Sequence, residues 1–395
     1  MTFEEVIGQA EVKKNLTSLV RDNRLSHALL FLSREGSGGL PLALALSQYI
    51  VCEKVSGNNE PSLFGDPETP VIPDDACGIC SSCLKAAAMV HPDIHYAYPV
   101  IPRKSGDKPP VSTDYISEWR EFCKTYPYGN AFDWLQFIGA ENKQGNITAT
   151  ECNDIIRKLN LKSFESIYKI LLMWMPEYLG NEGNKLLKLI EEPPANTLFI
   201  LVAQDESKVL STIISRTQQI RIPALETEDI ATALISRAAT TEDSAHKAAS
   251  VAEGNYREAL QLLQHAESDW QGMIREWLNA ALRTGPAEQV KWVNEVNLLG
   301  REKQKQLLRY FNHLLEQSIR LRILGREHLT GPANEIDFAE RFNKTATLAQ
   351  QQAIVSELDN AVYYIERNAN AKMLFQALTI KIYHIIRDNA VAVIA

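Results

Sequence analysis

Three continuous apolar runs in the first 222 residues constrain the fold of this chain more than any other feature. The runs are His27–Leu32 (HALLFL), Ile167–Trp174 (IYKILLMW) and Thr197–Ala203 (TLFILVA). Because they lack polar alternation, they favour strands that are buried on both faces, as in a parallel sheet. Helical segments separate them, and Thr148 with Glu151 is typical of a capping box that opens a helix at 149–160. We therefore predict a doubly wound parallel α/β module over residues 1–222.

The character of the sequence changes after Ile222, where the strand patterns stop and helical periodicity continues to residue 395. A chain of this length is long enough for two or three domains. We predict a small helical domain at 223–268 and a bundle of longer helices at 269–395, so that the fold class is α/β plus all-α. The longer helices include segments at 301–324 and 372–387.

The formal net charge of −8 argues against a protein that grips nucleic acid alone through bulk positive charge, although a local basic face stays open. No apolar run reaches the roughly 20 residues that a membrane span needs. The first residues lack a basic segment followed by an apolar one, which is the pattern of an export signal. We expect a cytoplasmic protein without a membrane partner.

Four of the six cysteines form a candidate metal site. Cys77, Cys80 and Cys83 have C-x2-C-x2-C spacing, and Cys52 precedes Cys77 by 25 positions. In a reducing compartment such a set can close a tetrahedral four-thiolate shell around a structural Zn²⁺ ion. An iron–sulfur cluster also takes four cysteine ligands, and a set of ordinary reduced thiols is the third interpretation. We predict a zinc module over residues 52–83.

The turn after the first apolar run stands where a P-loop would bind phosphate. A P-loop has the pattern G-x-x-x-x-G-K-[ST], whose lysine contacts the β- and γ-phosphates and whose hydroxyl group binds Mg²⁺. The matching octet is Ser33-Arg34-Glu35-Gly36-Ser37-Gly38-Gly39-Leu40. Ser33 replaces the first glycine, Gly39 the lysine and Leu40 the hydroxyl residue. The loop keeps Gly36 and Gly38 but has no cation where one is required.

The second half of a P-loop ATPase site is also missing. In such enzymes the next apolar strand ends in an acid pair, of which one member holds Mg²⁺ and the other polarises water. Here Trp174 and Met175 occupy these positions, and Glu177 lies two or three positions too late for either role. The sequence therefore indicates the layout of a P-loop ATPase without the residues that hold and hydrolyse ATP.

Several motifs occur in an order that resembles one family. They are Ile7-Gly8-Gln9, His27-Ala28, the loop 33–40, the four cysteines, Leu189–Pro194 (LIEEPP), Ser215-Arg216 and Gly254–Leu260 (GNYREAL). Together they make the chain similar to the AAA+ clamp-loader subunits of DNA polymerase III, the bacterial replicative polymerase. The motifs cover residues 1–262, and the likeness of 270–395 is only architectural. The resemblance implies an AAA+ module at 1–222 with an insertion at 100–148, a lid domain at 223–268 and a collar or oligomerisation domain at 269–395.

The resemblance also gives roles to individual residues. It implies that Arg216 is an arginine finger, which projects into the ATP site of a neighbouring subunit and stabilises charge on the transferred phosphoryl group, while Ser215 helps to place it. From the residues alone, Arg216 would be a surface arginine at the end of a short helix, and Thr217 stands where the family has cysteine. Arg257 matches a position that contacts nucleotide in active relatives. Without the lysine and the acid pair, we expect it to make a structural ion pair instead.

Two further segments keep two interpretations each. Glu191 and Glu192 either end a helix or face a neighbouring subunit, as the corresponding segment does in the family. The insertion at 100–148 contains an aromatic stretch at 132–137. Such side chains can stack on bases, but they more often pack an insertion against a core, and we favour packing.

The function implied by the resemblance is that of a subunit with no ATPase activity of its own in a heteropentameric clamp loader. As part of the DNA polymerase III holoenzyme, it would carry structural zinc and bind no ATP. It would stand beside gamma/tau and delta subunits and reach the sliding clamp and primed DNA through the assembly. Two alternatives are an ATPase with an unconventional nucleotide loop and a stand-alone zinc-containing protein that binds nucleic acid.

Overall fold

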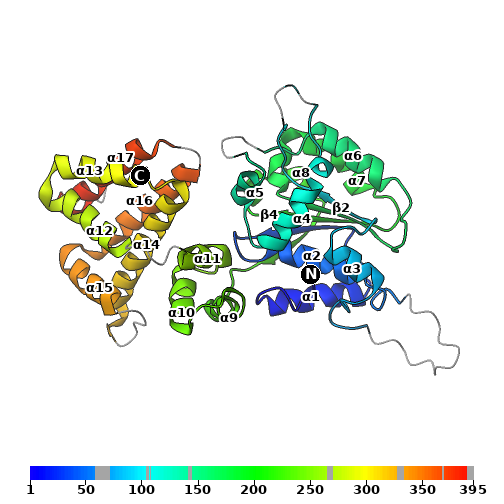
Figure 1. The fold of residues 1–395 in the computed structure, drawn as a ribbon, viewed down its shortest axis with the longest axis horizontal. Coiled ribbons are helices and arrows are strands. Elements are labelled where there is room, and N and C mark those ends of the chain that lie inside the picture. Colours follow the sequence, from blue (N-terminus) through cyan, green and yellow to red (C-terminus); the bar gives the residue numbers. More distant parts are fainter. Residues whose placement is uncertain are drawn as a thin grey trace. The chain divides into compact units, whose positions relative to one another are not determined.

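A computed structural model describes residues 1–57, 72–103, 106, 108–140, 145–264, 270–326, 333–366 and 369–388. Parts of the predicted zinc module, of the insertion at 100–148 and of the two C-terminal domains therefore lie outside the described residues. The chain divides into two compact units, Met1–Leu260 and Gln261–Ala395 (Figure 1). The three-domain division, with boundaries after residues 222 and 268, stays a prediction.

Five strands form the sheet of the first unit. They are β1 (Ala28–Ser33), β2 (Ile94–Ala97), β3 (Lys169–Trp174), β4 (Thr197–Ala203) and β5 (Gln218–Ile222). Their order across the sheet is β2-β3-β4-β1-β5, and every neighbouring pair is parallel. Every residue of β1, β3 and β4 is buried, which confirms the prediction from the three apolar runs.

The first unit also contains helices. They are α1 (Ala10–Arg21), α2 (Gly39–Val51), α3 (Ser81–Ala87), α4 (Ile116–Thr125), α5 (Ala131–Phe137), α6 (Ala149–Leu159), α7 (Leu187–Glu191), α8 (Ser211–Ile214), α9 (Thr227–Ala238), α10 (Glu242–Val251) and α11 (Tyr256–Gln264), which begins in this unit. Short 3₁₀ segments are η1 (Ser112–Tyr115), η2 (Pro176–Leu186) and η3 (Glu206–Lys208). Figure 1 shows α9, α10 and α11 gathered as one group.

Each face of the sheet has its own apolar core, because successive side chains of a strand point to opposite faces. Leu29 and Phe31 of β1 belong to a cluster that includes residues of α2, α4 and α5. Leu30 and Leu32 belong to a second cluster with residues of α6, α7 and α8. The sheet is therefore covered on both sides, as the lack of polar alternation predicted.

Two local features differ from the sequence prediction. The apolar runs did not indicate β2, which has four residues, or β5, an edge strand whose Gln218, Gln219 and Arg221 are exposed. The capping box at α6 forms only in part. Thr148 Oγ1 accepts a hydrogen bond from the Glu151 backbone N–H at 3.1 Å, but the Glu151 carboxylate is buried and accepts one from the backbone N–H of Ser112 instead.

The second unit is entirely helical over its described residues. Beyond the end of α11 it contains α12 (Trp270–Asn279), a π-helical turn η4 (Ala280–Thr284), α13 (Pro286–Asn297), α14 (Arg301–Leu324), α15 (Ala333–Thr345), α16 (Leu348–Glu366) and α17 (Ala371–Arg387). The predicted helices at 301–324 and 372–387 are confirmed as α14 and α17. One apolar core, which includes Trp277, Phe311 and Phe375, holds them together. Among the described residues, none of the helices combines the length and the apolar character of a membrane span.

Candidate functional site

The loop between β1 and α2 occupies the position of a P-loop. The strand ends at Ser33 and the helix begins at Gly39, so the turn lies at the carboxyl edge of the sheet, where α/β proteins bind their ligands. Ser33, Gly36, Gly38, Gly39 and Leu40 are all buried. Gly36 and Gly38 have left-handed φ angles of +68° and +99°. The glycine-rich backbone is therefore retained, although the cation is replaced.

Protein atoms fill the inside of this turn. A Cβ atom on Gly36 would lie 1.8 Å from Oδ1 of Asn255, so only glycine lets the two approach. The backbone N–H of Tyr256 donates to the Gly36 carbonyl at 3.2 Å. From the other side, Gln9 Nε2 donates to the Ser37 carbonyl at 3.0 Å. The segment before α11 thus packs directly on the loop that holds phosphate in a working ATPase.

The positions of the acid pair hold apolar side chains in the structure as well. Trp174 ends β3, and its ring lies 5.3 Å from that of Trp119 and 5.9 Å from that of Phe122. Met175 is buried with φ +58° and ψ +60°. Glu177 is partly buried, and its Oε1 accepts hydrogen bonds from the backbone N–H groups of residues 204 and 205 at 2.6 and 2.9 Å. Burial raises the pKa of Glu177. Its carboxylate therefore binds the backbone that follows β4.

Arg257 makes the structural ion pair that we expected. It is buried, and its guanidinium group donates to both oxygens of Asp133, with Nη2 at 2.6 Å from Oδ1. Its Nη1 lies 3.1 Å from Oε1 of Glu35 in the nucleotide loop. Asp133 belongs to α5 in the insertion, where Asn130 caps the helix. Arg257 therefore joins α11, the insertion and the nucleotide loop.

The insertion makes a second contact with the same region through Tyr128. Its hydroxyl group accepts a hydrogen bond from the backbone N–H of Ile7 at 2.8 Å, and its ring lies 5.0 Å from that of Tyr256. Burial raises the pKa of Tyr128 to about 12. Trp134, from the aromatic stretch, is fully buried, as the packing interpretation predicted. The insertion fastens the segment at α11 to the sheet module.

Arg216 lies at the other edge of the sheet. It follows α8 and precedes β5, which starts at Gln218 in register with Leu29, near the amino end of β1. Its side chain is 35% exposed. Nη1 donates to the Thr212 carbonyl at 2.9 Å and to Ser215 Oγ at 3.3 Å, and Nε pairs with the Glu191 carboxylate. The four to five residues of β1 separate Arg216 from the nucleotide loop of its own chain, a span of about 13–17 Å along the strand.

The structure brings all four predicted metal ligands together. The sulfur atoms of Cys52, Cys77, Cys80 and Cys83 lie within 4.8 Å of one another. Cys52 follows the last residue of α2, and Cys80 is the N-cap of α3. A tetrahedral zinc–thiolate site has Zn–S distances of about 2.3 Å and hence S···S separations of about 3.8 Å. Cys77 and Cys83 have their sulfur atoms 3.9 Å apart, so the geometry fits such a site.

Backbone N–H groups point at these sulfur atoms. The N–H of Cys77 donates to Cys52 Sγ, and the N–H of Cys83 donates to Cys80 Sγ, both at 3.4 Å. Burial opposes the charged form of Cys77, but N–H donors from Ile79 and Cys80 outweigh it and lower its pKa to about 7. Burial raises the pKa values of Cys52 and Cys83. Buried thiols of this kind favour the thiolate only when a cation compensates the charge, so the donor set suits a metal such as zinc.

Comparison with known proteins shows that this chain is similar to subunits of DNA polymerase III. A family model described as "DNA polymerase III, delta subunit" matches residues 8–226, which is more than half of the chain. The tau subunit of DNA polymerase III from Bacillus subtilis is 25% identical over 321 residues, covering 80% of this chain and 46% of tau. The delta' subunit from the same organism is 26% identical over 261 residues, covering 66% of this chain and 60% of that subunit. The chain thus spans about half the length of these two relatives.

A third relative aligns over almost the whole chain. The delta' subunit from Escherichia coli is 23% identical over 385 residues, covering 96% of this chain and 95% of that subunit. The parallel sheet in the order β2-β3-β4-β1-β5, with the glycine-rich turn after β1 and helical domains after β5, defines an AAA+-like module whose nucleotide-binding residues are replaced. The chain belongs to the delta' subunit family of DNA polymerase III, which is related to the gamma/tau clamp-loader subunits.

Several residues of the candidate site could not be assigned from the sequence. Asn255 and Glu35 lie within motifs that we quoted, but nothing indicated that they would meet across the nucleotide loop. Asp133 and Tyr128 lie in the insertion, for which we predicted no function. The spacing of Asn130 and Asp133 is a capping signal that could have located α5, but not its pairing with Arg257.

Proposed function

We propose that this chain is a subunit of the DNA polymerase III clamp loader that binds no ATP and lends Arg216 to the ATP site of a neighbouring subunit. The partners would be gamma/tau and delta subunits, and the assembly would place a sliding clamp on primed DNA. The observation that carries the proposal is the filled nucleotide loop. Asn255 stands against Gly36, and Arg257 is already bound by two carboxylates.

The absence of the phosphate-binding lysine and of the acid pair also supports a subunit that binds no ATP, independently of the packing inside the loop. A triphosphate needs a lysine and a carboxylate-held Mg²⁺ ion, and these positions hold Gly39, Trp174 and Met175. Because Arg216 lies at the opposite edge of the sheet from this loop, it is unsuited to the nucleotide loop of its own chain. A neighbouring subunit in a ring is the place where its charge can act. Guanidinium suits the role because it stays charged and donates in a fixed fork.

The contact of Arg216 with Glu191 is compatible with such a role. Both side chains are partly exposed, at 35% and 47%, and an exposed ion pair contributes only about 0–1 kcal/mol. A phosphate group from a neighbour can therefore replace the carboxylate at little cost. Glu191 belongs to the LIEEPP motif and ends α7. Its pairing with Arg216 connects two motifs that the family resemblance singled out separately.

We further propose that Cys52, Cys77, Cys80 and Cys83 hold one structural Zn²⁺ ion. All four positions of a tetrahedral site are filled by protein sulfur, which leaves no position for a reacting water. The ion would join the end of α2 to the start of α3. Glu53 supports this region, since its Oε1 accepts hydrogen bonds from the backbone N–H and the hydroxyl group of Ser82.

The test is reconstitution of the clamp loader with Arg216→Ala. We expect ATP-driven clamp loading to fall at least about tenfold, because an arginine finger contributes about 10³–10⁵ to kcat in related phosphoryl transfers. Assembly, followed by size-exclusion chromatography, should be unchanged. Arg221→Ala is the matched control, because Arg221 is an exposed arginine of β5 that pairs with Glu206. Normal loading by an intact Arg216→Ala complex would refute the finger assignment.

Nucleotide binding is measured separately on the isolated chain. Isothermal titration with ATP and Mg²⁺ should show no binding, because the loop lacks both charge and space. Micromolar binding would contradict the proposal and favour an ATPase with an unconventional loop.

A further inference from the structure

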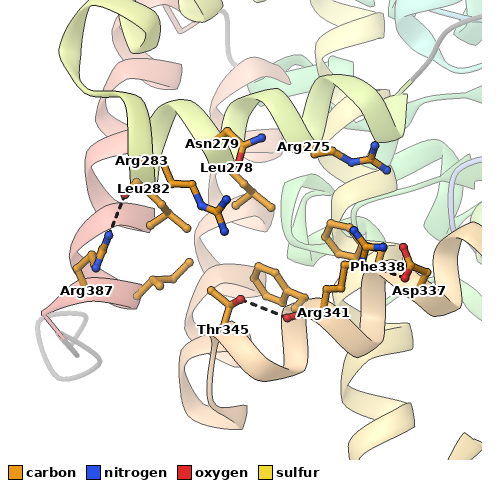
Figure 2. Close-up of a pocket in the computed structure, with 12 residues that line it drawn as sticks. Arg275, Leu278, Asn279, Leu282, Arg283, Asp337, Phe338, Arg341, Thr345 and Arg387 are labelled. Carbon is orange, nitrogen blue, oxygen red and sulfur yellow. Dashed lines mark hydrogen bonds and ion pairs between the residues drawn. The ribbon is translucent and has the colours of Figure 1, made fainter.

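The C-terminal unit contains a pocket that combines an apolar floor with a cationic rim. The pocket has a volume of about 540 Å³. It is lined by four arginines, one aspartate, two phenylalanines and further apolar and polar side chains. These residues come from α12 with η4, from α15 and from the end of α17 (Figure 2). Neither the family resemblance nor the nucleotide loop gives this pocket a role.

A π-helical turn builds one wall. After Asn279 the helix α12 widens into η4, and π-helical turns often occur at functional sites. Such a turn leaves carbonyl groups without their usual helical partners, and side chains satisfy several of them here. Gln289 Nε2 donates to the Ala280 carbonyl at 3.2 Å, and Arg387 Nη2 donates to the Leu282 carbonyl at 3.0 Å. The wall that carries Leu282 and Arg283 is therefore held in place from two sides.

Positive charge dominates the rim. Arg275, Arg283, Arg341 and Arg387 line the pocket with a single carboxylate, that of Asp337. This carboxylate is already paired, because Arg341 Nε lies 2.9 Å from Asp337 Oδ1. In the described part of the chain, the guanidinium groups of Arg275 and Arg283 have no hydrogen-bond or ion-pair partner, and Figure 2 shows Arg283 pointing into the pocket. Four guanidinium groups around one carboxylate make this surface locally positive, although the net charge of the chain is −8.

The floor of the pocket favours one class of ligand over another. Phe338 and Phe342 are 9% and 5% exposed, and their rings are stacked on each other with centroids 5.5 Å apart. Bases of single-stranded nucleic acid need exposed aromatic faces to stack on, and these faces are covered. Leu278, Leu282 and Ile386 add apolar surface suited to an aliphatic or aromatic side chain. A pocket of this size is typical of sites that hold a group much larger than an inorganic anion.

We infer that this pocket binds an acidic peptide segment of a partner protein. An apolar side chain of the peptide contacts the partly exposed Leu278, Leu282 and Ile386. Its carboxylates pair with Arg275 and Arg283, the two arginines without a partner in the described structure. Pairing of guanidinium with carboxylate in two parallel hydrogen bonds gives this recognition both energy and direction. The inference is independent of the proposed role of Arg216, which lies in the other unit.

The experiment uses the full-length chain and an array of immobilised dodecapeptides of random sequence. We expect the retained peptides to combine Asp or Glu with Leu, Phe or Ile, and fluorescence anisotropy then gives their dissociation constants in solution. Arg275→Glu and Arg283→Glu should each weaken binding at least about tenfold, which equals about 1.4 kcal/mol. Arg320→Glu, on an exposed position of α14, is the charge-matched control and should bind as the unaltered chain does.

Three outcomes would overturn the inference. The first is an array without enrichment of acidic and apolar residues together. The second is equal loss of binding in Arg283→Glu and Arg320→Glu, which would show that peptide binding depends on the net charge of the chain and not on the pocket. The third is binding of labelled oligothymidylate that Arg283→Glu abolishes while no acidic peptide binds, which would assign the pocket to nucleic acid. Thermal unfolding of each variant shows whether the exposed substitutions leave the fold intact.

Discussion

The nucleotide loop and the cysteine cluster lie at opposite ends of α2, and each contains a glycine with nearly the same left-handed φ angle but a different role. Gly36 has φ +68° and Gly78 has φ +69°. A Cβ atom on Gly36 would overlap Asn255, whereas one on Gly78 would meet its nearest neighbour, Thr2, at 4.0 Å. In the first loop, glycine admits another part of the protein. In the second, it only permits the tight turn between Cys77 and Cys80.

The difference shows how a ligand site can lose or keep its ligand within one module. The nucleotide loop has a glycine-rich backbone but no lysine at the phosphate-binding position, and Asn255 packs against Gly36. The cysteine cluster has its four thiol groups together, with the sulfur atoms within 4.8 Å of one another. The first loop is therefore predicted to be stabilised by contacts within the protein, and the second by a bound ion.

Removing one thiol should have the largest effect of the changes considered. We expect about one zinc ion per chain in the purified protein and none in Cys80→Ala, measured by elemental analysis. The free energy of unfolding should fall by several kcal/mol, because a structural zinc contributes about 10–16 kcal/mol in small zinc-finger peptides. Cys123→Ala is the control, since Cys123 is a buried cysteine outside the cluster. Full metal content in Cys80→Ala would contradict the four-thiolate site.

Asp133→Asn tests the closure of the nucleotide loop and should have the next largest effect. It removes the charge that pairs with the buried Arg257, and breaking a buried pair costs about 3–5 kcal/mol. Because Glu35 still contacts Arg257, we expect a loss near the lower end, about 3 kcal/mol, in urea unfolding. The exposed pair of Asp243 with Lys247 is the comparison, and Asp243→Ala should cost less than about 1 kcal/mol.

Asp133→Asn also tests whether ATP is excluded by the lack of charged residues in the nucleotide loop or by the lack of space. If Asp133→Asn loosens the contact of α11 with the loop, the site gains room but still lacks its lysine and its acid pair. Isothermal titration should therefore still show no ATP binding. ATP binding by the loosened variant would mean that filling alone keeps nucleotide out. Equal losses of stability in Asp133→Asn and Asp243→Ala would show that the buried pair stabilises the fold no more than an exposed pair does.

The sequence predicted those parts of the molecule that depend on local pattern. Strands β1, β3 and β4 follow from uninterrupted apolar residues, because burial on both faces leaves no place for polar ones. The four cysteines could be grouped by spacing, since three of them lie within seven positions. The replaced residues at Gly39, Trp174 and Met175 could be recognised because a phosphate site requires particular chemical groups at particular places.

Contacts between distant segments could not be predicted in this way. Arg257 meets Asp133 across 124 positions and Glu35 across 222 positions. Nothing in the local sequence of α5 distinguishes Asp133 from any acidic residue in the first turn of a helix. The edge strand β5 was missed for a related reason, since its alternating exposure reflects its place at the end of the sheet. The cationic pocket of the second unit also arises only when α12, α15 and α17 meet.

Gly36→Ala tests the contact with Asn255 and should have the smallest of these effects. The left-handed φ angle alone costs about 1–2 kcal/mol for alanine, and the overlap with Asn255 should add about 1 kcal/mol. Gly139→Ala is the matched control, because Gly139 has φ +74° and a Cβ there would meet no atom within 4 Å. In a double-mutant cycle with Asn255→Ala, the double variant should lose less stability than the sum of the two single losses, because Asn255→Ala removes the overlap. If Gly36→Ala and Gly139→Ala are equally destabilised and the cycle is additive, the nucleotide loop is open rather than filled, and its difference from the loop at Gly78 disappears.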